Sequence, residues 1–135
     1  ALAQCLIDRE DLDMATVSAP LAESEYEDPS AVKVVVSRKG EALYFSRSLI
    51  PYPRHPFSEP PQKHIGVYAY RREFLLTYAA LPQTPLEKTE SLEQLRALEM
   101  GYRIGVIRSN MQGIGIDTEE DLANANAYFE RNGEK

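Results

Sequence analysis

The chain has 135 residues, the length of one domain that can bury a core of its own. Its 15 basic and 21 acidic residues give a net charge of -6, which argues against a surface for nucleic acid or for an anionic membrane. The single cysteine, Cys5, excludes an intrachain disulfide and favours a reducing compartment, so we expect a cytoplasmic protein. No apolar run approaches the roughly 20 residues that a membrane-spanning helix needs.

The first half of the chain predicts one helix and three strands. Residues 31–37, AVKVVVS, form a nearly continuous β-branched run, which is typical of a strand covered on both faces. The Lys39-Gly40 turn joins this run to the segment ALYFS, so we expect the two strands to form a hairpin. The predicted elements are a helix over 1–9 and strands over 14–19, 31–37 and 42–46.

The second half begins with a loop, because residues 50–61 contain five prolines that cannot donate to a ladder. The stretch Thr84-Pro85-Leu86-Glu87 combines a capping box with proline at the first helical position, so a helix starts there and runs to Met100. Further elements are strands over 64–70 and 102–107 and helices over 72–80 and 118–131. The order predicts the α/β class, with a mixed sheet, flanking helices and a β-hairpin.

The strand HIGVYAY has two different faces. Read with a period of two, it places His64, Gly66, Tyr68 and Tyr70 on one side. The imidazole and the phenols would offer hydrogen bonds on either side of the space that glycine leaves, which suits a hydroxylated ligand. The alternative is an exposed strand face, where tyrosine is common for its β-propensity alone. Both interpretations fit the pattern.

Arg47 ends the strand ALYFSR on the same face as Leu43 and Phe45. The planar guanidinium of an arginine in this place suits a carboxylate. Composition favours a plainer interpretation, in which Arg47 extends into solvent or pairs with one of the many glutamates.

Glu93 falls among three apolar residues on the wheel of the predicted helix. These neighbours are Leu86, Ala97 and Met100. A carboxylate in such surroundings needs a partner, because burying it unpaired is costly. Gln94 adds an amide beside it. The competing interpretation is an ordinary salt bridge to a nearby arginine such as Arg96 or Arg103.

Asp117 lies in GIGIDTEEDL, just before the cap of the last predicted helix. A carboxylate there can complement the positive end of the helix or ligate a hard cation such as magnesium. A lone aspartate is a weak indication of a metal, so spacing alone favours the capping role.

Together these signals resemble 3-deoxy-manno-octulosonate cytidylyltransferase, the CMP-Kdo synthetase family of bacterial lipopolysaccharide biosynthesis. The resemblance rests on DPSAVKVVVS, ALYFSRSLIPYPR, KHIGVYAYRREFL, PLEKTESLEQLRALEMGYRI and GIGIDTEEDL. It covers nearly the whole chain but only the C-terminal part of the family, whose N-terminal CTP-binding part has no counterpart here. The resemblance implies that residues 1–135 are the sugar-binding and dimerising part of a nucleotide-sugar-transferase, Rossmann-like fold.

The resemblance also implies roles for individual residues. Those expected to line the pocket for Kdo, an eight-carbon acidic sugar, are Arg47, His64, Tyr68, Glu93 and Gln94. Arg47 would hold the sugar carboxylate, Glu93 and Gln94 would fix hydroxyl groups, and Asp117 would be a catalytic magnesium ligand. The implied reaction is attack of the anomeric hydroxyl of Kdo on the α-phosphate of CTP, which gives CMP-Kdo and pyrophosphate. The implied assembly is a homodimer.

Two other functions stay open from the sequence. Because the chain lacks a glycine-rich phosphate loop, we expect it to be inactive alone, and it would then be a non-catalytic binding or oligomerisation module. A cytidylyltransferase for another acidic sugar, such as a sialic acid, is the other alternative, although the spacing of LEQLR and HxGxY argues against it.

Overall fold

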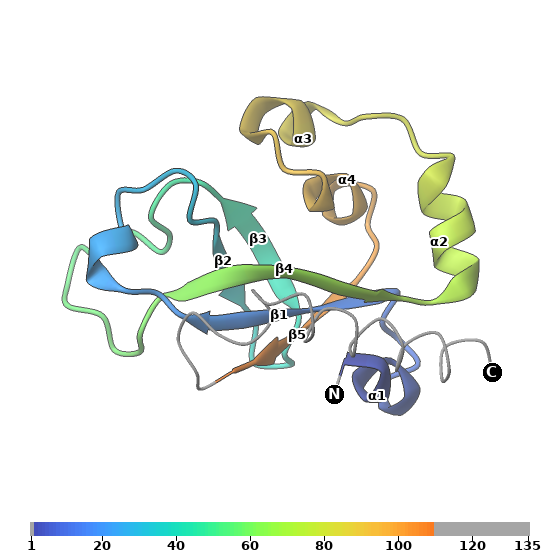
Figure 1. Cartoon of the computed structure of the whole chain (residues 1–135), viewed down its shortest axis with the longest axis horizontal. Coiled ribbons are helices and arrows are strands. Elements are labelled where there is room, and N and C mark those ends of the chain that lie inside the picture. Colours follow the sequence, from blue (N-terminus) through green and yellow to red (C-terminus); the bar gives the residue numbers. More distant parts are fainter. Residues whose placement is uncertain (1, 110–135) are drawn as a thin grey trace.

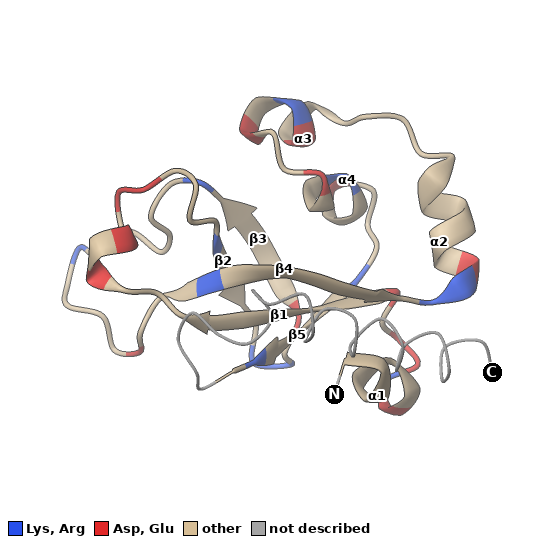
Figure 2. Cartoon of the chain, viewed as in Figure 1, with Lys and Arg blue, Asp and Glu red and all other residues tan. Residues whose placement is uncertain are grey.

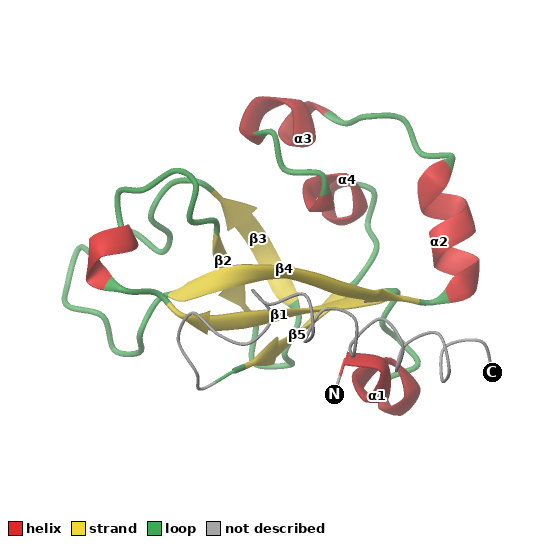
Figure 3. Cartoon of the chain, viewed as in Figure 1, coloured by secondary structure: helices red, strands yellow, loops and turns green. Residues whose placement is uncertain are grey.

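A five-stranded mixed sheet forms the centre of the computed structural model, which describes residues 2–109 (Figures 1 and 3). Its strands are β1 (Met14–Pro20), β2 (Lys33–Val36), β3 (Ala42–Ser46), β4 (Gln62–Tyr70) and β5 (Ile104–Arg108). Their order is β3-β2-β4-β1-β5, and only the β1–β5 pair among these neighbours is parallel. The helices are α1 (Leu2–Asp8), the short 3-10 helix η1 (Glu23–Glu25), α2 (Arg72–Ala79), α3 (Pro85–Glu90) and α4 (Gln94–Glu99). The predicted mixed α/β class is confirmed.

Helices cover both faces of the sheet (Figure 1). α2, α3 and α4 lie on one face, and the core between them and the strands includes Met14, Phe45, Phe74, Leu95 and Ile104. α1 lies on the opposite face over a smaller core of Leu6, Leu12, Ala15 and Ala69. None of the helices in the described part of the chain is both long and apolar enough to cross a bilayer.

β4 keeps the predicted alternation of faces despite a bulge. Thr16 of β1 pairs with Tyr68, but the next residue, Val17, pairs with Ile65, so two residues of β4 have no opposite residue on β1. Because the insertion is two residues long, the alternation resumes in phase. His64 and Tyr68 therefore stay on one face, with their ring centroids 5.4 Å apart.

β2 and β3 form the predicted hairpin, but an irregular register changes one of its faces. Val35 pairs with Tyr44 and Val36 pairs with Ala42, which leaves Leu43 without an opposite residue. Leu43 is 60% exposed, whereas Phe45 is completely buried. The prediction that these two side chains share an apolar face is therefore wrong, because a bulge separates them.

The predicted helix over 85–100 is instead two helices, α3 and α4, and this prediction is wrong. Ser91 follows α3 with φ 57°, in the left-handed region that ends a helix. Arg96 of α4 then reaches back to Glu87 of α3, with Nε and Nη2 donating to the two carboxylate oxygens at 2.8 and 2.6 Å. The break allows Leu92 and Leu95 to enter the core together.

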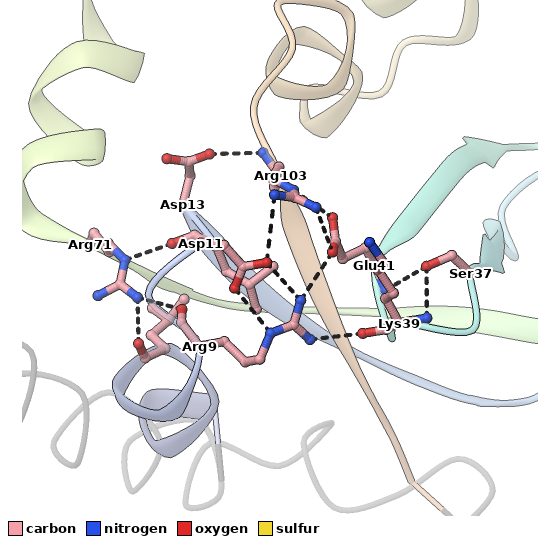
Figure 4. Close-up of polar contacts among 10 residues, drawn as sticks. Arg9, Asp11, Asp13, Ser37, Lys39, Glu41, Arg71 and Arg103 are labelled. Carbon is pink, nitrogen blue, oxygen red and sulfur yellow. Dashed lines mark hydrogen bonds and ion pairs between the residues drawn. The ribbon is translucent and has the colours of Figure 1, made fainter.

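A cluster of charged side chains holds the turn after β2 against β5 (Figure 4). Glu41 accepts hydrogen bonds from Arg9 Nη2 at 3.0 Å and from Arg103 Nε at 2.9 Å. Beside this cluster the backbone N–H of Val106 donates to the carbonyl of Gly40 at 2.8 Å. The two edge strands of the sheet, β3 and β5, are thereby joined at one end.

Candidate functional site

His64 is held in β4 by its backbone and by its ring. Its N–H donates to the carbonyl of Val32 at 2.7 Å, and its Nε2 lies 2.8 Å from Thr16 Oγ1. The Thr16 hydroxyl has a single hydrogen, which it donates to the carbonyl of Val67 at 2.7 Å. The network therefore assigns the Nε2–H tautomer to His64, and Nδ1 is left as an acceptor for a ligand hydroxyl.

The imidazole of His64 is uncharged at neutral pH. Burial lowers the pKa of His64 to about 4. The ring of Phe45 stands edge-on to it with a centroid distance of 4.9 Å, and Tyr68 borders its other side. A neutral histidine binds hydroxyl groups but does not attract a carboxylate, so the charge that an acidic ligand requires must come from another residue.

Tyr68 belongs to a row of aromatic rings that leads toward the start of α4. It stacks on Tyr70 at a centroid distance of 5.8 Å, and Tyr70 in turn contacts Tyr78 of α2. Burial raises the pKa of Tyr68 and of Tyr78, and the nearby carboxylate of Glu93 raises both further. The Tyr78 hydroxyl donates to the backbone carbonyl of Glu93 at 2.9 Å, which ties α4 to α2.

Glu93 is exposed, so the expectation that apolar neighbours bury it is wrong. The break between α3 and α4 is the reason, because it turns Leu86 and Met100 outward, where they are 39% and 48% exposed. Gln94, the first residue of α4, is buried. The carboxylate of Glu93 therefore stands at the surface beside the aromatic row.

The two arginines considered as salt-bridge partners of Glu93 bind other carboxylates instead. Arg96 binds the carboxylate of Glu87 with two hydrogen bonds. Arg103 binds Glu41 in the cluster of Figure 4. Both arginines are thus engaged by other carboxylates.

Arg47 lies at the junction of α3 and α4. Its Nε donates to the carbonyl of Glu90 at 2.7 Å, its Nη2 to Ser91 at 3.0 Å and its Nη1 to Pro29 at 2.8 Å. Among the ion pairs of residues 2–109, none joins Arg47 to a carboxylate. Three of its five N–H groups bind backbone, and the other two can donate to a ligand.

A cavity of about 240 Å³ adjoins His64 and Gly66. An added Cβ at Gly66 would meet no atom within 4 Å, so the glycine leaves open space there. The Glu25–Lys63 ion pair, with Nζ 2.7 Å from Oε2, lies in its wall. Acidic residues lie in η1 and in the segment that follows it, near this cavity (red in Figure 2).

The structure brings the predicted site residues into two adjacent groups. His64 borders the cavity, whereas Arg47, Glu93 and Gln94 gather at the junction of α3 and α4 and do not line it. Tyr68 connects the groups: its ring contacts His64 on one side and Tyr70 on the other, and Tyr70 contacts Tyr78, whose hydroxyl binds the carbonyl of Glu93.

Asp117, the expected metal ligand, lies outside the described residues. Within residues 2–109, no group of three His, Cys, Asp or Glu side chains is close enough to hold a metal ion. Magnesium at Asp117 is therefore an expectation that rests on the resemblance alone.

Lys33 is a residue near the site that the sequence interpretation missed. Its side chain is completely buried, and its Nζ donates to the carbonyl of Arg47 at 2.9 Å. The available signal was a lysine inside the apolar run AVKVVVS, because a charged residue in a buried strand needs polar partners.

Comparisons with known proteins agree with the sequence resemblance. A family model described as cytidylyltransferase matches residues 1–104. The 3-deoxy-manno-octulosonate cytidylyltransferase of Syntrophotalea carbinolica is 49% identical over 128 residues, which cover 87% of this chain and 51% of that protein. The protein of the same name from Synechococcus elongatus is 51% identical over 118 residues, which cover 86% of this chain and 48% of that protein.

One solved structure is also similar over most of the chain. It is a CMP:2-keto-3-deoxy-manno-octonic acid synthetase complexed with CTP, with a TM-score of 0.78 and 42% sequence identity. The match covers 96% of this chain and 54% of that one. The chain thus spans about half the length of the curated relatives it matches.

Proposed function

Because the chain belongs to the cytidylyltransferase family, we propose that it supplies the sugar pocket and one metal ligand of an enzyme that activates Kdo with CTP. The complete enzyme would make CMP-Kdo and pyrophosphate for lipopolysaccharide biosynthesis. The observation that carries this proposal is the identity of 49% and 51% to two relatives named for this activity.

The chemistry requires positioning more than covalent catalysis. The anomeric oxygen of Kdo forms a bond to the α-phosphorus of CTP as the bond from that phosphorus to the leaving pyrophosphate breaks. No covalent enzyme intermediate is needed, so the chain's part is to orient the sugar and to offset charge. Arg47 supplies the positive charge and neutral His64 supplies a hydroxyl acceptor.

Each residue proposed to bind the sugar has surroundings that support its role. The two remaining N–H groups of Arg47 donate to the Kdo carboxylate. His64 accepts a sugar hydroxyl at Nδ1, and Tyr68 borders the ring beside it. The exposed carboxylate of Glu93 accepts hydrogen bonds from sugar hydroxyls, and the amide of Gln94, the first residue of α4, fixes hydroxyl groups as well.

Asp117 is proposed as a ligand of magnesium, which would neutralise the phosphates of CTP. In the complete protein, Asp117→Asn should remove most turnover while the melting temperature stays near that of the unsubstituted protein. Asp8→Asn, on the exposed side of α1, is the matched control. Normal magnesium-dependent turnover in Asp117→Asn would refute the metal role.

A homodimer in the cytoplasm is proposed as the working form, as the resemblance implies. Sedimentation velocity of the chain over a range of concentrations tests the assembly. A species of twice the chain mass is expected, and a monomer at all concentrations would contradict it.

Isothermal titration of the chain with Kdo, CTP and magnesium, separately and together, tests the sugar site. Kdo should bind, and Arg47→Ala should weaken it about tenfold or more, since a hydrogen bond to a charged group contributes about 1.5–3 kcal/mol. Arg72→Ala, an exposed residue at the start of α2, should leave the affinity unchanged. Titration with a sialic acid tests the alternative sugar, which should bind more weakly.

Two results would overturn the proposal. Equal affinity of the unsubstituted chain and Arg47→Ala for Kdo would show that Arg47 does not bind the Kdo carboxylate. Oligomers that form without any Kdo binding would favour the non-catalytic module instead.

A further inference from the structure

Lys33 is a buried ammonium without a carboxylate partner among the ion pairs of the described residues. Its Nζ donates to two backbone carbonyls, that of Asp28 at 2.8 Å and that of Arg47 at 2.9 Å. Burial lowers the pKa of Lys33. A buried charge costs free energy unless its hydrogen bonds compensate, so these two bonds define what the side chain does in the fold.

Glu90 binds Arg47 from the opposite side. Its Oε1 accepts the backbone N–H of Arg47 at 2.9 Å, and its Oε2 accepts the hydroxyl of Tyr44 at 3.3 Å. β3 ends one residue earlier, at Ser46. The N–H and the carbonyl of Arg47 are therefore held by two side chains of opposite charge, Glu90 and Lys33.

Lys33 also holds one of the acceptors of the guanidinium. Asp28, whose carbonyl accepts from Lys33, precedes Pro29, whose carbonyl accepts from Arg47 Nη1 at 2.8 Å. The ammonium thus fixes both the backbone of Arg47 and the turn on which part of its guanidinium rests. Loss of the ammonium would free both ends of this arrangement together.

We propose that Lys33 is a positioning residue for Arg47, which it holds so that the two remaining N–H groups of the guanidinium meet the carboxylate of the acidic sugar. The inference rests on the proposed function of Arg47 and deepens it. Lys33 itself does not touch the sugar, because its side chain is fully buried beneath the turn. Its whole effect on binding passes through Arg47.

A double-mutant cycle separates this role from a general contribution to folding. Kdo is titrated into the chain and into Lys33→Met, Arg47→Met and the double variant, since methionine keeps the unbranched apolar stem of lysine. Each single variant should weaken Kdo binding about tenfold or more. The double variant should bind no more weakly than Arg47→Met, because the two residues act as one unit. Lys88→Met, exposed on α3, is the matched control and should leave the affinity unchanged.

The Nε–H proton of Arg47 gives a second readout that does not depend on the ligand. In the unsubstituted chain its hydrogen bond to the carbonyl of Glu90 should slow exchange with water, observed in a ¹⁵N-resolved spectrum. Lys33→Met should make this exchange at least tenfold faster, and Lys88→Met should not. If Lys33→Met does not fold, Lys33→Gln, which retains a donor, should give a smaller change in the same direction.

The outcomes distinguish the two proposals. Unchanged Kdo affinity in Arg47→Met, or no binding by the unsubstituted chain, contradicts the proposed function. Weak binding by Arg47→Met with normal binding by Lys33→Met overturns the positioning role alone. So does unchanged Nε–H exchange, or a double variant in which the two losses simply add.

Discussion

His64 Nε2 lies 2.8 Å from the hydroxyl of Thr16, across the pairing of β4 with β1, and it is the donor in the tautomer assigned above. The same hydroxyl donates onward to the carbonyl of Val67, so the three groups form a chain with one direction. Burial keeps the imidazole neutral, and with the hydrogen on Nε2 the unprotonated nitrogen is Nδ1. Protonation in acid would make Nδ1 a donor instead of an acceptor, because a protonated ring donates from both nitrogens.

Stability should decrease as the pH falls, because of His64. Its pKa is about 4 in the folded chain against 6.5 for an unperturbed histidine, so the unfolded chain binds more protons between these values. The unfolding free energy therefore rises with pH in this window, and the contribution of His64 is lost as pH falls from about 6.5 to about 4. Over this window the unfolding free energy should decrease by about 3 kcal/mol because of His64.

Urea unfolding at intervals from pH 4 to pH 7 measures this dependence. His64→Gln should flatten it, and His55→Gln, at an exposed position, should not. Identical pH dependence in the unsubstituted chain and His64→Gln would contradict the prediction.

Two glycines of the sheet should respond differently to alanine. At Gly105 an added Cβ would lie 2.5 Å from Leu12 Cδ1 and 3.3 Å from Cys5 Sγ, whereas at Gly66 it would meet nothing within 4 Å. Gly105→Ala should lower the unfolding free energy by about 1–3 kcal/mol through overpacking. Gly66→Ala should stay within about 0.5 kcal/mol of the unsubstituted chain.

Gly66→Ala should affect Kdo binding more than it affects stability. Alanine there would fill space beside His64, so Gly66→Ala should weaken Kdo binding while the protein stays folded. Thermal unfolding and calorimetric titration of the same samples give both quantities. Full Kdo affinity in Gly66→Ala would show that the sugar does not lie against this strand.

The Glu87–Arg96 ion pair should stabilise the two short helices. Hydrogen bonds from Arg96 hold the pKa of Glu87 below its usual value, so this contribution is present near neutral pH and is lost as pH falls below about 4.5. Glu87→Gln should lower the unfolding free energy at pH 7 by about 2 kcal/mol. Chemical unfolding at pH 7 tests this, with Glu10→Gln, an exposed residue, as control. Equal loss in both variants would indicate a general effect of charge.

The cluster around Glu41 should stabilise the chain in a salt-dependent way. Glu41 accepts from two arginines, and its side chain is only 13% exposed. Glu41→Gln should lower the free energy of unfolding by about 1 kcal/mol at low ionic strength. Added salt should reduce this difference between the variant and the unsubstituted chain. Melting temperatures at 20 mM and 500 mM salt, roughly 20 and 4–5 Å in screening length, measure it. A difference that does not change with salt would exclude an electrostatic origin, and Glu73→Gln is the control.

The sequence predicted elements whose signals are local. Alternation in HIGVYAY predicted both the strand and its His64–Tyr68 face, and the turn at Lys39-Gly40 predicted the hairpin. The break at Ser91 escaped prediction because ESLEQL contains neither glycine nor proline, and its leucines continue a helical period. What favours the break is tertiary, namely the Glu87–Arg96 pair and the burial of Leu92.

The candidate site likewise has features that the sequence predicts and features that arise only in the fold. A histidine, a glycine and a tyrosine on one strand face are visible in the sequence, and so is an arginine at a strand end. The carbonyls that receive Arg47 belong to Pro29, Glu90 and Ser91, far from it along the chain and close only in the fold. The exposure of Glu93 likewise follows from the break, which the helical wheel did not contain.

The interruption at Ser91 has a consequence for substrate choice. Because residues 91–93 set the direction of α4, a change in their length or conformation would re-aim Glu93 and Gln94 without disturbing the strand that carries His64. Under the proposed function, selectivity among related acids could therefore change through the exposed residues Ser91 and Glu93, while the buried Leu92 keeps its place in the core.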